Sequence, residues 1–414
     1  MIDHLNTIII GGGQAGLATS YCLKQRGHEH VIFDKAPRAA SAWRKRWDSF
    51  TLVTPNWMVQ LPGAKYQGNN PDGFMIREEI VAFFEAYIER FNLPIHYGVN
   101  VRSVEPSDSG YLISTNTRDY LANNVVVAHG FYQHPFQPNF STNCPGFINQ
   151  IHSSQYMNPE VLPEGAVLVV GSAQSGSQIA EELNEEGRQV YLSVGTTGRF
   201  PRRYRGKDAY TWMEKLGYFN RTVDQLPPSQ SKYAASAHGT GKNGGHTINL
   251  HQFARDGIVL LGHLEHIEGN HAYLAPDLKD NLAIADQFEN EFVQEIDQYI
   301  QDTGIDCPQE TLPILEDGFK ADEIRELDLL NAGIRTIIWA TGYQSDFKMI
   351  KCPVFDHKGL PQHNRGITEW PGLYFIGMPF LHSGKSGLLY GTGEDAGHIA
   401  SAITARERVI SYTR

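Results

Sequence analysis

One phosphate-binding pattern occurs twice in this chain, and the repetition limits the possible folds more than any other feature. An apolar strand runs into the turn G-x-(G/A)-x-x-G in residues 7–16, and the pattern returns 160 residues later in residues 167–176. Each turn opens a predicted helix, which a glycine closes at the same offset, Gly27 and Gly187. A strand, a glycine turn and a helix in this order start a Rossmann βαβ unit, whose helix N-terminus faces a pyrophosphate. Two such units predict two dinucleotide sites.

The two copies differ where the ribose of a dinucleotide is recognised. In the first copy the second strand ends at Asp34, a carboxylate that can accept hydrogen bonds from ribose hydroxyls. The second copy has Val194 at this position, followed by Thr196, Arg199 and Arg202. Hydroxyl and guanidinium groups without a carboxylate suit a 2′-phosphate. We therefore predict FAD or NAD in the first site and NADPH in the second; the alternative is that the arginines only cover a polar surface.

Composition indicates a soluble globular protein of two or three domains. The chain has 414 residues, 41% of them hydrophobic, which is enough for a large core. Its 35 basic and 46 acidic residues give a formal net charge of -11, which argues against nucleic acid or an anionic membrane as a partner. No apolar stretch approaches the roughly 20 residues of a membrane helix, and the first strand leaves no room for a signal peptide. We therefore expect a cytoplasmic protein.

The cysteines and histidines bear on the possible chemistry. The chain has four cysteines, Cys22, Cys144, Cys307 and Cys352. No two of them form a C-x-x-C pair, which fits a reducing compartment and disfavours flavoenzymes that pass electrons through a dithiol. His238 and His246 flank a glycine-rich stretch, but their spacing is not that of compact metal ligands. We predict a mobile loop there and no metal site.

Alternating apolar strands and amphipathic helices predict an α/β fold with two Rossmann-like domains, the second inserted into the first. We predict an FAD-binding domain in residues 1–163 that resumes in residues 336–414. The NADPH-binding domain is expected in residues 164–335, with a long irregular insertion. In this division the apolar strand 336–343 returns the chain to the first domain.

Periodicity predicts several individual elements. Apolar residues at helical spacing indicate helices over residues 77–91 and 282–300. A final helix is expected to begin near Gly393, with Glu394 and Asp395 in its first turn. Short strands are expected as a small antiparallel layer and a return into the first sheet, at residues 95–97, 111–115 and 125–128.

Further residues resemble the class B flavin-dependent monooxygenases, a group with flavin-containing monooxygenases, N-hydroxylating enzymes and the YUCCA-type enzymes of plants. The likeness rests on the two glycine turns, on Trp43, on residues 52–56 and on the A-T-G-Y strand end at residues 340–343, and it spans nearly the whole chain. The chain also resembles flavin-dependent oxidoreductases often encoded beside nitrilases. The resemblance implies that Trp43 and Asn56 lie near the isoalloxazine ring.

The candidate site residues combine the motifs with this resemblance. Asn56 and Trp43 are the catalytic candidates. The cofactor-binding candidates are Gly11, Gly13, Gln14, Ala15, Gly16, Asp34, Lys35, Trp43, Gly171, Ala173, Gln174, Ser175, Gly176, Thr196, Arg199, Arg202, Thr341, Gly342 and Leu389. One departure from the family is clear: its F-x-G-x-x-x-H-x-x-x-aromatic fingerprint keeps His152 and Tyr156, but Ile148 replaces the glycine. A Baeyer–Villiger signature is therefore not supported.

The resemblance implies an NADPH- and FAD-dependent monooxygenase in which the flavin performs the chemistry. NADPH would reduce FAD, dioxygen would add as a C4a-(hydro)peroxide, and a small soft nucleophile, with nitrogen favoured, would take the distal oxygen. Amines, nitriles and oximes are the compounds to test first. The alternatives are an NADPH-dependent reductase or dehydrogenase without oxygen transfer, and a non-catalytic flavin redox sensor. The substrate, the oligomeric state, with which a homodimer is compatible, and the roles of His129, His382 and residues 199–250 are not fixed by the sequence.

Overall fold

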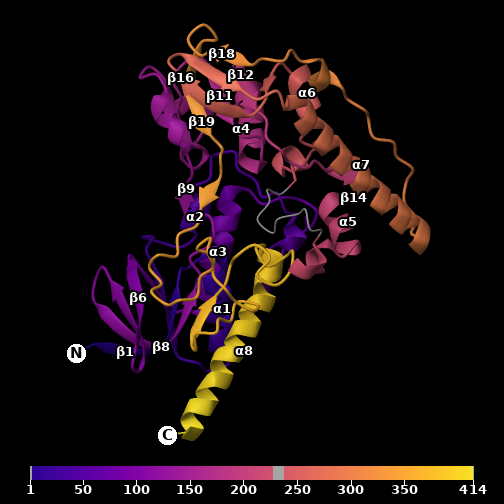
Figure 1. Ribbon diagram of the computed structural model, residues 1–414. Coiled ribbons are helices and arrows are strands. Elements are labelled where there is room, and N and C mark those ends of the chain that lie inside the picture. Colours follow the sequence, from indigo (N-terminus) through magenta and orange to yellow (C-terminus); the bar gives the residue numbers. More distant parts are fainter. Residues whose placement is uncertain (1, 227–236, 414) are drawn as a thin grey trace.

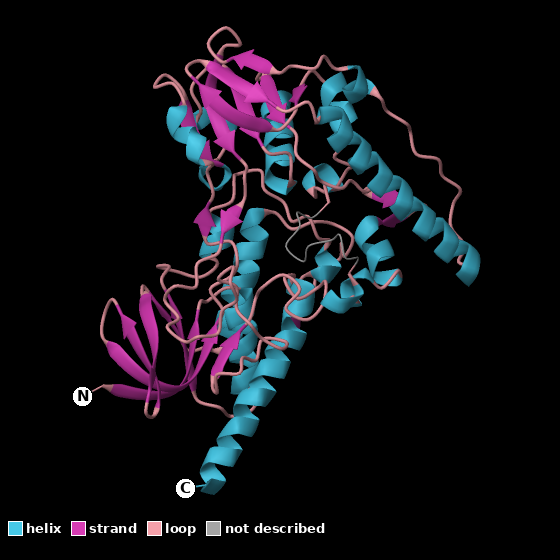
Figure 2. Ribbon diagram, viewed as in Figure 1, coloured by secondary structure: helices cyan, strands magenta, loops and turns pink. Residues whose placement is uncertain are grey.

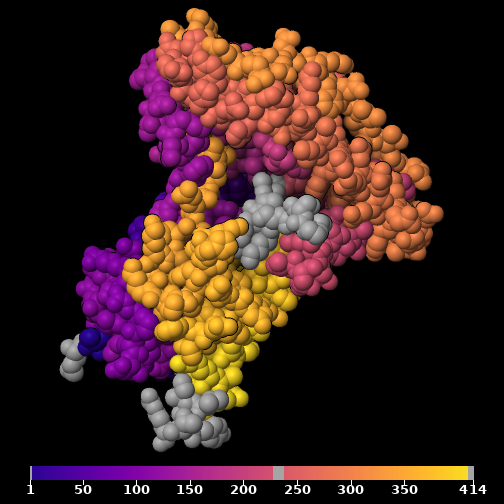
Figure 3. Space-filling model, viewed as in Figure 1, coloured from indigo at the N-terminus to yellow at the C-terminus, as the bar shows by residue number. Residues whose placement is uncertain are grey.

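The computed structural model describes residues 2–226 and 237–413, which form two α/β lobes (Figure 1). The lower lobe contains both ends of the described chain, and the upper lobe contains the middle of it (Figure 1). The second domain is thus inserted into the first, as predicted. In Figure 3 the outline is indented on the left between the lobes, where indigo to purple and orange segments lie beside each other.

The first lobe is built on a mixed sheet that has seven strands in the described part of the chain, in the order β5-β2-β1-β8-β7-β6, with β21 also on β8. Its strands are β1 (Asp3–Ile10), β2 (His30–Asp34), β5 (Ile95–Tyr97), β6 (Val101–Ser107), β7 (Gly110–Thr115), β8 (Asp119–Val127) and β21 (Leu373–Phe375). Strands β6, β7 and β8 form an antiparallel meander. Residues 95–97 were predicted to belong to a small antiparallel layer, and this prediction was wrong. Strand β5 pairs parallel with β2 at the edge of the main sheet, and β6 is the strand that pairs antiparallel with β7.

Helices α1 (Gln14–Lys24), α2 (Ser41–Arg44), α3 (Arg77–Phe91) and α8 (Leu389–Thr413) belong to the same lobe. Helix α3 has the predicted bounds, but α8 begins at Leu389 and not near Gly393. Gly391 and Gly393 lie inside the helix, where the absence of a side chain allows close packing. A Cβ at Gly391 would overlap the carbonyl oxygen of Lys385, and one at Gly393 would lie 3.0 Å from Pro62.

The second lobe contains a parallel sheet, with five strands among the described residues in the order β10-β19-β11-β12-β15. Its strands are β10 (Asn149–His152), β11 (Ala166–Val170), β12 (Val190–Ser193), β15 (Val259–Leu261) and β19 (Ile334–Trp339), and α4 (Gln174–Glu185) follows β11. Strand β19 lies between β10 and β11, so the predicted domain boundary at residue 336 is wrong. A buried apolar strand fits either sheet, and its sequence does not say which one it joins.

The remaining elements surround these sheets (Figure 2). They include a second antiparallel layer, three helices and three short ribbons: β16 (Leu264–Glu268), β17 (His271–Leu274) and β18 (Glu326–Asp328); α5 (Ala209–Lys215), α6 (Leu250–Arg255) and α7 (Leu278–Thr303); β3 (Gln60–Leu61) with β4 (Ala64–Lys65), β9 (His134–Pro135) with β20 (Tyr343–Gln344), and β13 (Arg203–Tyr204) with β14 (Lys207–Asp208). The short 3₁₀ turns are η1 (Asn56–Met58), η2 (Asn139–Asn143), η3 (Ser153–Gln155), η4 (Pro159–Val161), η5 (Tyr218–Asn220), η6 (Val223–Gln225), η7 (Lys242–Gly244) and η8 (Asp317–Lys320). Among the helices described, none is long and apolar enough to cross a membrane.

Candidate functional site

The first glycine turn lies between β1 and α1 and has the shape of a phosphate-binding loop. Gly11 has a φ of +109°, and a Cβ there would lie 2.6 Å from the carbonyl oxygen of Ala128. A Cβ at Gly16 would overlap the carbonyl oxygen of Gly11, which explains the tight contact of helix and strand. At Gly13, by contrast, an added Cβ would meet none of the described atoms within 4 Å. The turn therefore leaves open space at the α1 N-terminus, where a pyrophosphate can approach the backbone.

Asp34 fixes the ribose side of this first turn. One carboxylate oxygen accepts the Gly12 N–H at 2.6 Å, and the other accepts the Ala36 N–H at 2.7 Å. Each oxygen keeps a further lone pair, so a ribose hydroxyl can still donate to the carboxylate. The side chain is half-buried, and Lys35 beside it is exposed.

The second turn, between β11 and α4, repeats this backbone with different side chains. Gly171 has a φ of +99°, and a Cβ at this residue would lie 2.7 Å from the carbonyl oxygen of Ala340. A serine of this turn contacts the loop that follows β12: the Ser172 hydroxyl accepts the Gly195 N–H at 3.1 Å. The negative charge that Asp34 supplies in the first site is thus absent from the second. A site without that carboxylate suits a dinucleotide with a 2′-phosphate.

The arginines predicted to bind that phosphate have other partners, so this part of the prediction needs correction. Arg199 is buried, and one of its terminal nitrogens lies 2.6 Å from both Asp286 and Glu289 of α7. Two carboxylates therefore already neutralise its charge. Arg202 is buried against Asp208, with its Nε 2.8 Å from that carboxylate, and is not a surface group that could meet a phosphate. Thr196 is exposed and donates to Asn281 at 2.8 Å.

Residues 238–241 contact the second turn, although the sequence indicated a mobile loop there. His238 is buried, and its Nε2 donates to the Ser172 carbonyl oxygen at 2.5 Å. The side-chain amides of Gln174 and Gln178 both donate to the carbonyl oxygen of Gly239. On the other side, a Cβ at Gly241 would overlap the carbonyl oxygen of Leu52 in the first lobe. The segment is therefore packed between the two lobes, a position that no sequence signal indicated.

The A-T-G-Y strand end, residues 340–343, contacts the segment that crosses between the two lobes. Thr341 Oγ1 donates to the carbonyl oxygen of Phe136 at 2.5 Å, and the Gly342 carbonyl oxygen accepts from His152 Nε2 at 3.0 Å. Tyr156, the aromatic residue of the same fingerprint, is buried and donates to Glu182 at 2.9 Å. The retained fingerprint residues thus stabilise the crossing between the lobes.

A second group of residues converges on the N-terminus of α1. Gln14 Nε2 donates to the carbonyl oxygen of Gly387 at 2.9 Å, which brings the loop before α8 to this helix end. Leu389, the first residue of α8, is buried. The turn η1 lies beside it, because the Trp57 and Tyr390 rings meet edge to face with centroids 5.4 Å apart. Helix α1, the start of α8 and η1 therefore enclose one region of the first lobe.

The two catalytic candidates have different surroundings. Asn56 is 5% exposed; its Nδ2 donates to the Asn70 carbonyl oxygen at 3.0 Å, and its Oδ1 has no partner among the described residues. Exchanging the two amide ends would still leave one end unpaired, so the side chain offers a hydrogen bond to a ligand. Trp43 is half-buried and packs against Phe50 and Phe84, with ring centroids 6.1 and 6.2 Å away. Its contacts are those of a core residue that supports α3.

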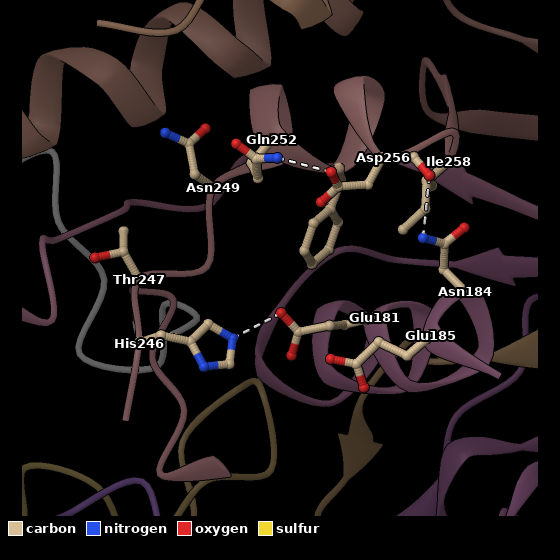
Figure 4. A pocket seen from close by; sticks show the side chains of 10 residues that line it. Glu181, Asn184, Glu185, His246, Thr247, Asn249, Gln252, Asp256 and Ile258 are labelled. Atoms are coloured by element: carbon tan, nitrogen blue, oxygen red, sulfur yellow. Dashed lines mark hydrogen bonds and ion pairs between the residues drawn. The ribbon is translucent and has the colours of Figure 1, made fainter. Parts of the chain in front are cut away.

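Two cavities accompany these motifs. One of about 220 Å³ lies between α4 and α6 (Figure 4), where His246 Nε2 is 2.7 Å from Glu181. The hydrogen bond to Glu181 raises the pKa of His246. Among the described residues that line this cavity, none is a predicted site residue. The other cavity, of about 380 Å³, lies between η1 and α5 and adjoins the region that holds Asn56.

Comparisons with known proteins agree with this arrangement. The chain is 35% identical to the uncharacterised oxidoreductase CzcO-like of Geobacillus kaustophilus, over 97% of this chain and 99% of that protein. The chain belongs to the CzcO-like oxidoreductases. Residues 8–212 match the family described as pyridine nucleotide-disulphide oxidoreductase. The probable indole-3-pyruvate monooxygenase YUCCA4 of Arabidopsis thaliana is 31% identical over 42% of this chain and 43% of its own length.

Solved structures show the same fold. The flavin-containing monooxygenase of Stenotrophomonas maltophilia superposes with a TM-score of 0.69 at 18% identity, covering 98% of this chain and 99% of that one. The bacillithiol disulfide reductase Bdr of Staphylococcus aureus gives a TM-score of 0.63 at 13% identity, covering 98% and 99%. The chain is therefore similar to the class B flavin-dependent monooxygenases, in sequence over part of its length and in fold over nearly all of it. FAD fits the first glycine turn with Asp34, and NADPH fits the second turn with its serine.

Proposed function

We propose that this CzcO-like protein is an NADPH- and FAD-dependent monooxygenase that oxygenates a small soft nucleophile, with nitrogen favoured. The observation that carries the proposal is the Asn56 side chain, which is buried with one unpaired amide end beside the start of α8. Leaving a buried polar group unpaired costs about 1–3 kcal/mol, so such a group is expected to have a partner in the working protein.

The residues around this region have separate tasks in the proposed reaction. The N-terminus of α1 and Asp34 hold the pyrophosphate and ribose of FAD, and the N-terminus of α4 holds the pyrophosphate of NADPH. Buried residues of α8 and η1, such as Leu389 and Met58, keep water away from the reacting atoms. Bound FAD supplies the redox chemistry, including the activation of dioxygen. Asn56 supplies a hydrogen bond that delays the unproductive loss of the activated oxygen.

The cysteines support oxygen transfer over disulfide reduction. Burial raises the pKa of Cys144 and that of Cys352 to about 11, and it also raises the pKa of Cys22. These thiols therefore stay protonated at neutral pH, and a protonated thiol is a poor nucleophile. A dithiol relay through them is disfavoured on this ground. An NADPH-dependent reductase without such a relay is the alternative that the experiment must separate.

Stopped-flow absorbance tests the proposal. NADPH-reduced enzyme is mixed with oxygenated buffer without substrate, and we expect a band between those of reduced and oxidised flavin that persists for seconds. Asn56→Ala should shorten its lifetime about 10- to 100-fold, because a hydrogen bond to a charged group contributes roughly 1.5–3 kcal/mol. Asn290→Ala, on an exposed position of α7, is the matched control and should leave the lifetime unchanged.

The other outcomes reject the proposal in different ways. A direct return to oxidised flavin in the wild type would identify a reductase or dehydrogenase. Failure of NADPH to reduce the flavin would identify a redox sensor. An unchanged lifetime in Asn56→Ala, with the band present in the wild type, would remove Asn56 from its assigned role and leave the monooxygenase assignment in place.

A further inference from the structure

A groove of about 380 Å³ lies where the first lobe meets the insertion of the second, and it is lined by Trp57, Pro71, Asp72, Thr211, Glu214 and Lys215. Trp57 and Pro71 provide an apolar side from the first lobe. Glu214 and Lys215 come from the end of α5 in the other lobe. With two carboxylates and one ammonium among its lining side chains, the groove is negatively charged at neutral pH.

Glu214 is the most unusual group in the groove. Its Oε1 accepts the Tyr390 hydroxyl at 2.7 Å, while its Oε2 is buried and has no hydrogen-bond partner among the described residues. A buried carboxylate oxygen without a donor is costly, and a charged donor compensates this cost better than a neutral one. Tyr390 cannot supply a second proton, since its single O–H already points to Oε1. The described residues therefore leave this oxygen without a donor, a place that a ligand can take.

Tyr390, which donates to this carboxylate, belongs to a group of aromatic rings. Tyr390 contacts Trp57 edge to face at 5.4 Å and Phe219 at 5.9 Å between ring centroids. Aromatic faces attract organic cations through their electrostatic quadrupole, most strongly in tryptophan. Lys385 Nζ lies 5.7 Å from the centroid of the Tyr390 ring, but its charge is paired with Glu394 at 2.5 Å, and no contact between Lys385 and Glu214 is seen among the described residues. Rings and a carboxylate with a free oxygen together form the chemical environment that recognises an ammonium group.

We propose that this groove binds an ammonium group of the substrate, held by Glu214 against Trp57 and Tyr390. The inference rests on the proposed function and narrows its substrate class. An ammonium nitrogen has no lone pair and cannot be oxygenated while it is protonated. The substrate is therefore a small molecule with a cationic ammonium group and a separate uncharged soft nucleophile, a second amine nitrogen or a thioether sulfur.

The groove also explains how the reacting atom would be placed. Trp57 follows Asn56 directly in η1, and Tyr390 follows Leu389 directly in α8. The residues that hold the cation are thus one position away in the chain from those assigned to the reaction. Anchoring the charged end outside would orient the uncharged end towards Asn56, which favours reaction at one atom of the substrate.

Calorimetric titration of the oxidised holoenzyme tests this inference without turnover. The probes are ethanolamine, which carries a primary ammonium group at pH 7, and its uncharged isostere 1-propanol, in which a methyl group replaces the ammonium. We expect ethanolamine to bind about tenfold or more tightly than 1-propanol, as cation–π and charged hydrogen-bond contributions predict. Glu214→Gln should reduce the ratio to near one, whereas Glu164→Gln, an exposed control, should preserve it. Tyr390→Phe keeps the carboxylate and should preserve the ratio as well.

Equal binding of the two probes to the wild type would overturn the inference, and so would an unchanged ratio in Glu214→Gln. Flavin absorbance and thermal melting confirm that each variant is folded. If Glu214→Gln is unstable, Tyr390→Phe serves as the second test. Loss of the affinity ratio between the two probes in Tyr390→Phe would also contradict the inference. The titration involves no oxygen chemistry. Preserved selectivity without oxygenation would reject the proposed function alone, and oxygenation without selectivity would reject the groove alone.

Discussion

Single residues distinguish the two nucleotide sites, whose backbones are nearly the same. In the first site a carboxylate, Asp34, accepts the Gly12 N–H, and in the second a hydroxyl, Ser172, accepts the Gly195 N–H. Both contacts connect the glycine turn to the loop after the following strand. The exchange removes one negative charge from the place predicted for the adenosine ribose. A 2′-phosphate would therefore meet no repulsion from a carboxylate in the second site, and this absence favours a phosphorylated ribose even without an arginine.

His238 gives a residue-scale prediction for pH. Burial is the main cause that lowers its pKa to about 4, and Arg199 contributes to the same direction, while the bond to the Ser172 carbonyl oxygen opposes them. A lowered pKa in the folded state means that this group's contribution to stability is present above about pH 6.5 and is lost as the pH falls towards 4. Between pH 7 and pH 4.5 the wild type should lose about 2 kcal/mol more stability than His238→Gln.

Thermal melting across this pH range measures the effect. His263→Gln, at an exposed position, is the control and should follow the wild type. Parallel pH profiles for the wild type and His238→Gln would show that the pKa of His238 does not change on folding, which would contradict its burial.

At the scale of elements, sequence patterns predicted the turns and helices that depend on local chemistry, but they missed the contacts that depend on packing between distant segments. The two glycine turns and α3 were predicted to the residue, because apolar spacing and steric needs of glycine act locally. Strand β19 was assigned to the wrong lobe, since a fully buried strand has no polar face that identifies its sheet. Arg199 was assigned to a phosphate because its acidic partners on α7 lie 87 and 90 residues away in the sequence.

Helix α8 provides a prediction that compares two of its own glycines. A Cβ at Gly391 would overlap the Lys385 carbonyl oxygen, a backbone atom that cannot easily move, whereas one at Gly397 would meet none of the described atoms within 4 Å. Gly391→Ala should therefore destabilise the fold by about 1–3 kcal/mol and lower FAD affinity, since the loop before α8 contacts Gln14. Gly397→Ala should stabilise it by about 0.5–1 kcal/mol, because alanine favours helix. Denaturant unfolding measures the stability of each variant, and the flavin content of the purified protein reports its FAD affinity. Equal effects of the two substitutions would contradict the packing argument.

For the whole molecule, Arg202 is a residue that connects the two lobes through direct contacts. It extends from the second lobe and donates through Nη1 to the Val53 carbonyl oxygen of the first lobe at 2.7 Å. Its guanidinium also lies over the Phe74 ring of the first lobe, 4.3 Å from the centroid, and pairs with Asp208 in its own lobe. The side chain is 1% exposed. Removing one member of a buried ion pair leaves the other uncompensated and costs about 3–5 kcal/mol.

In calorimetry, we expect the two lobes of the wild type to unfold in one transition or in two closely spaced transitions. Arg202→Met should move these two transitions apart in temperature. Small-angle scattering should report a larger radius for the variant, because the contact with Val53 and Phe74 is lost. Arg203→Met is the matched control: this exposed neighbour bonds only to Gly244 and Gly245 among the described residues, so its loss should leave both measurements unchanged. Double substitution with Asp208→Asn should recover part of the stability, since it removes the unpaired carboxylate, but not the compact radius. If Arg202→Met kept the wild-type radius, the lobes would be held together by the packing of residues 238–241 instead, and Arg202 would serve only the stability of its own lobe.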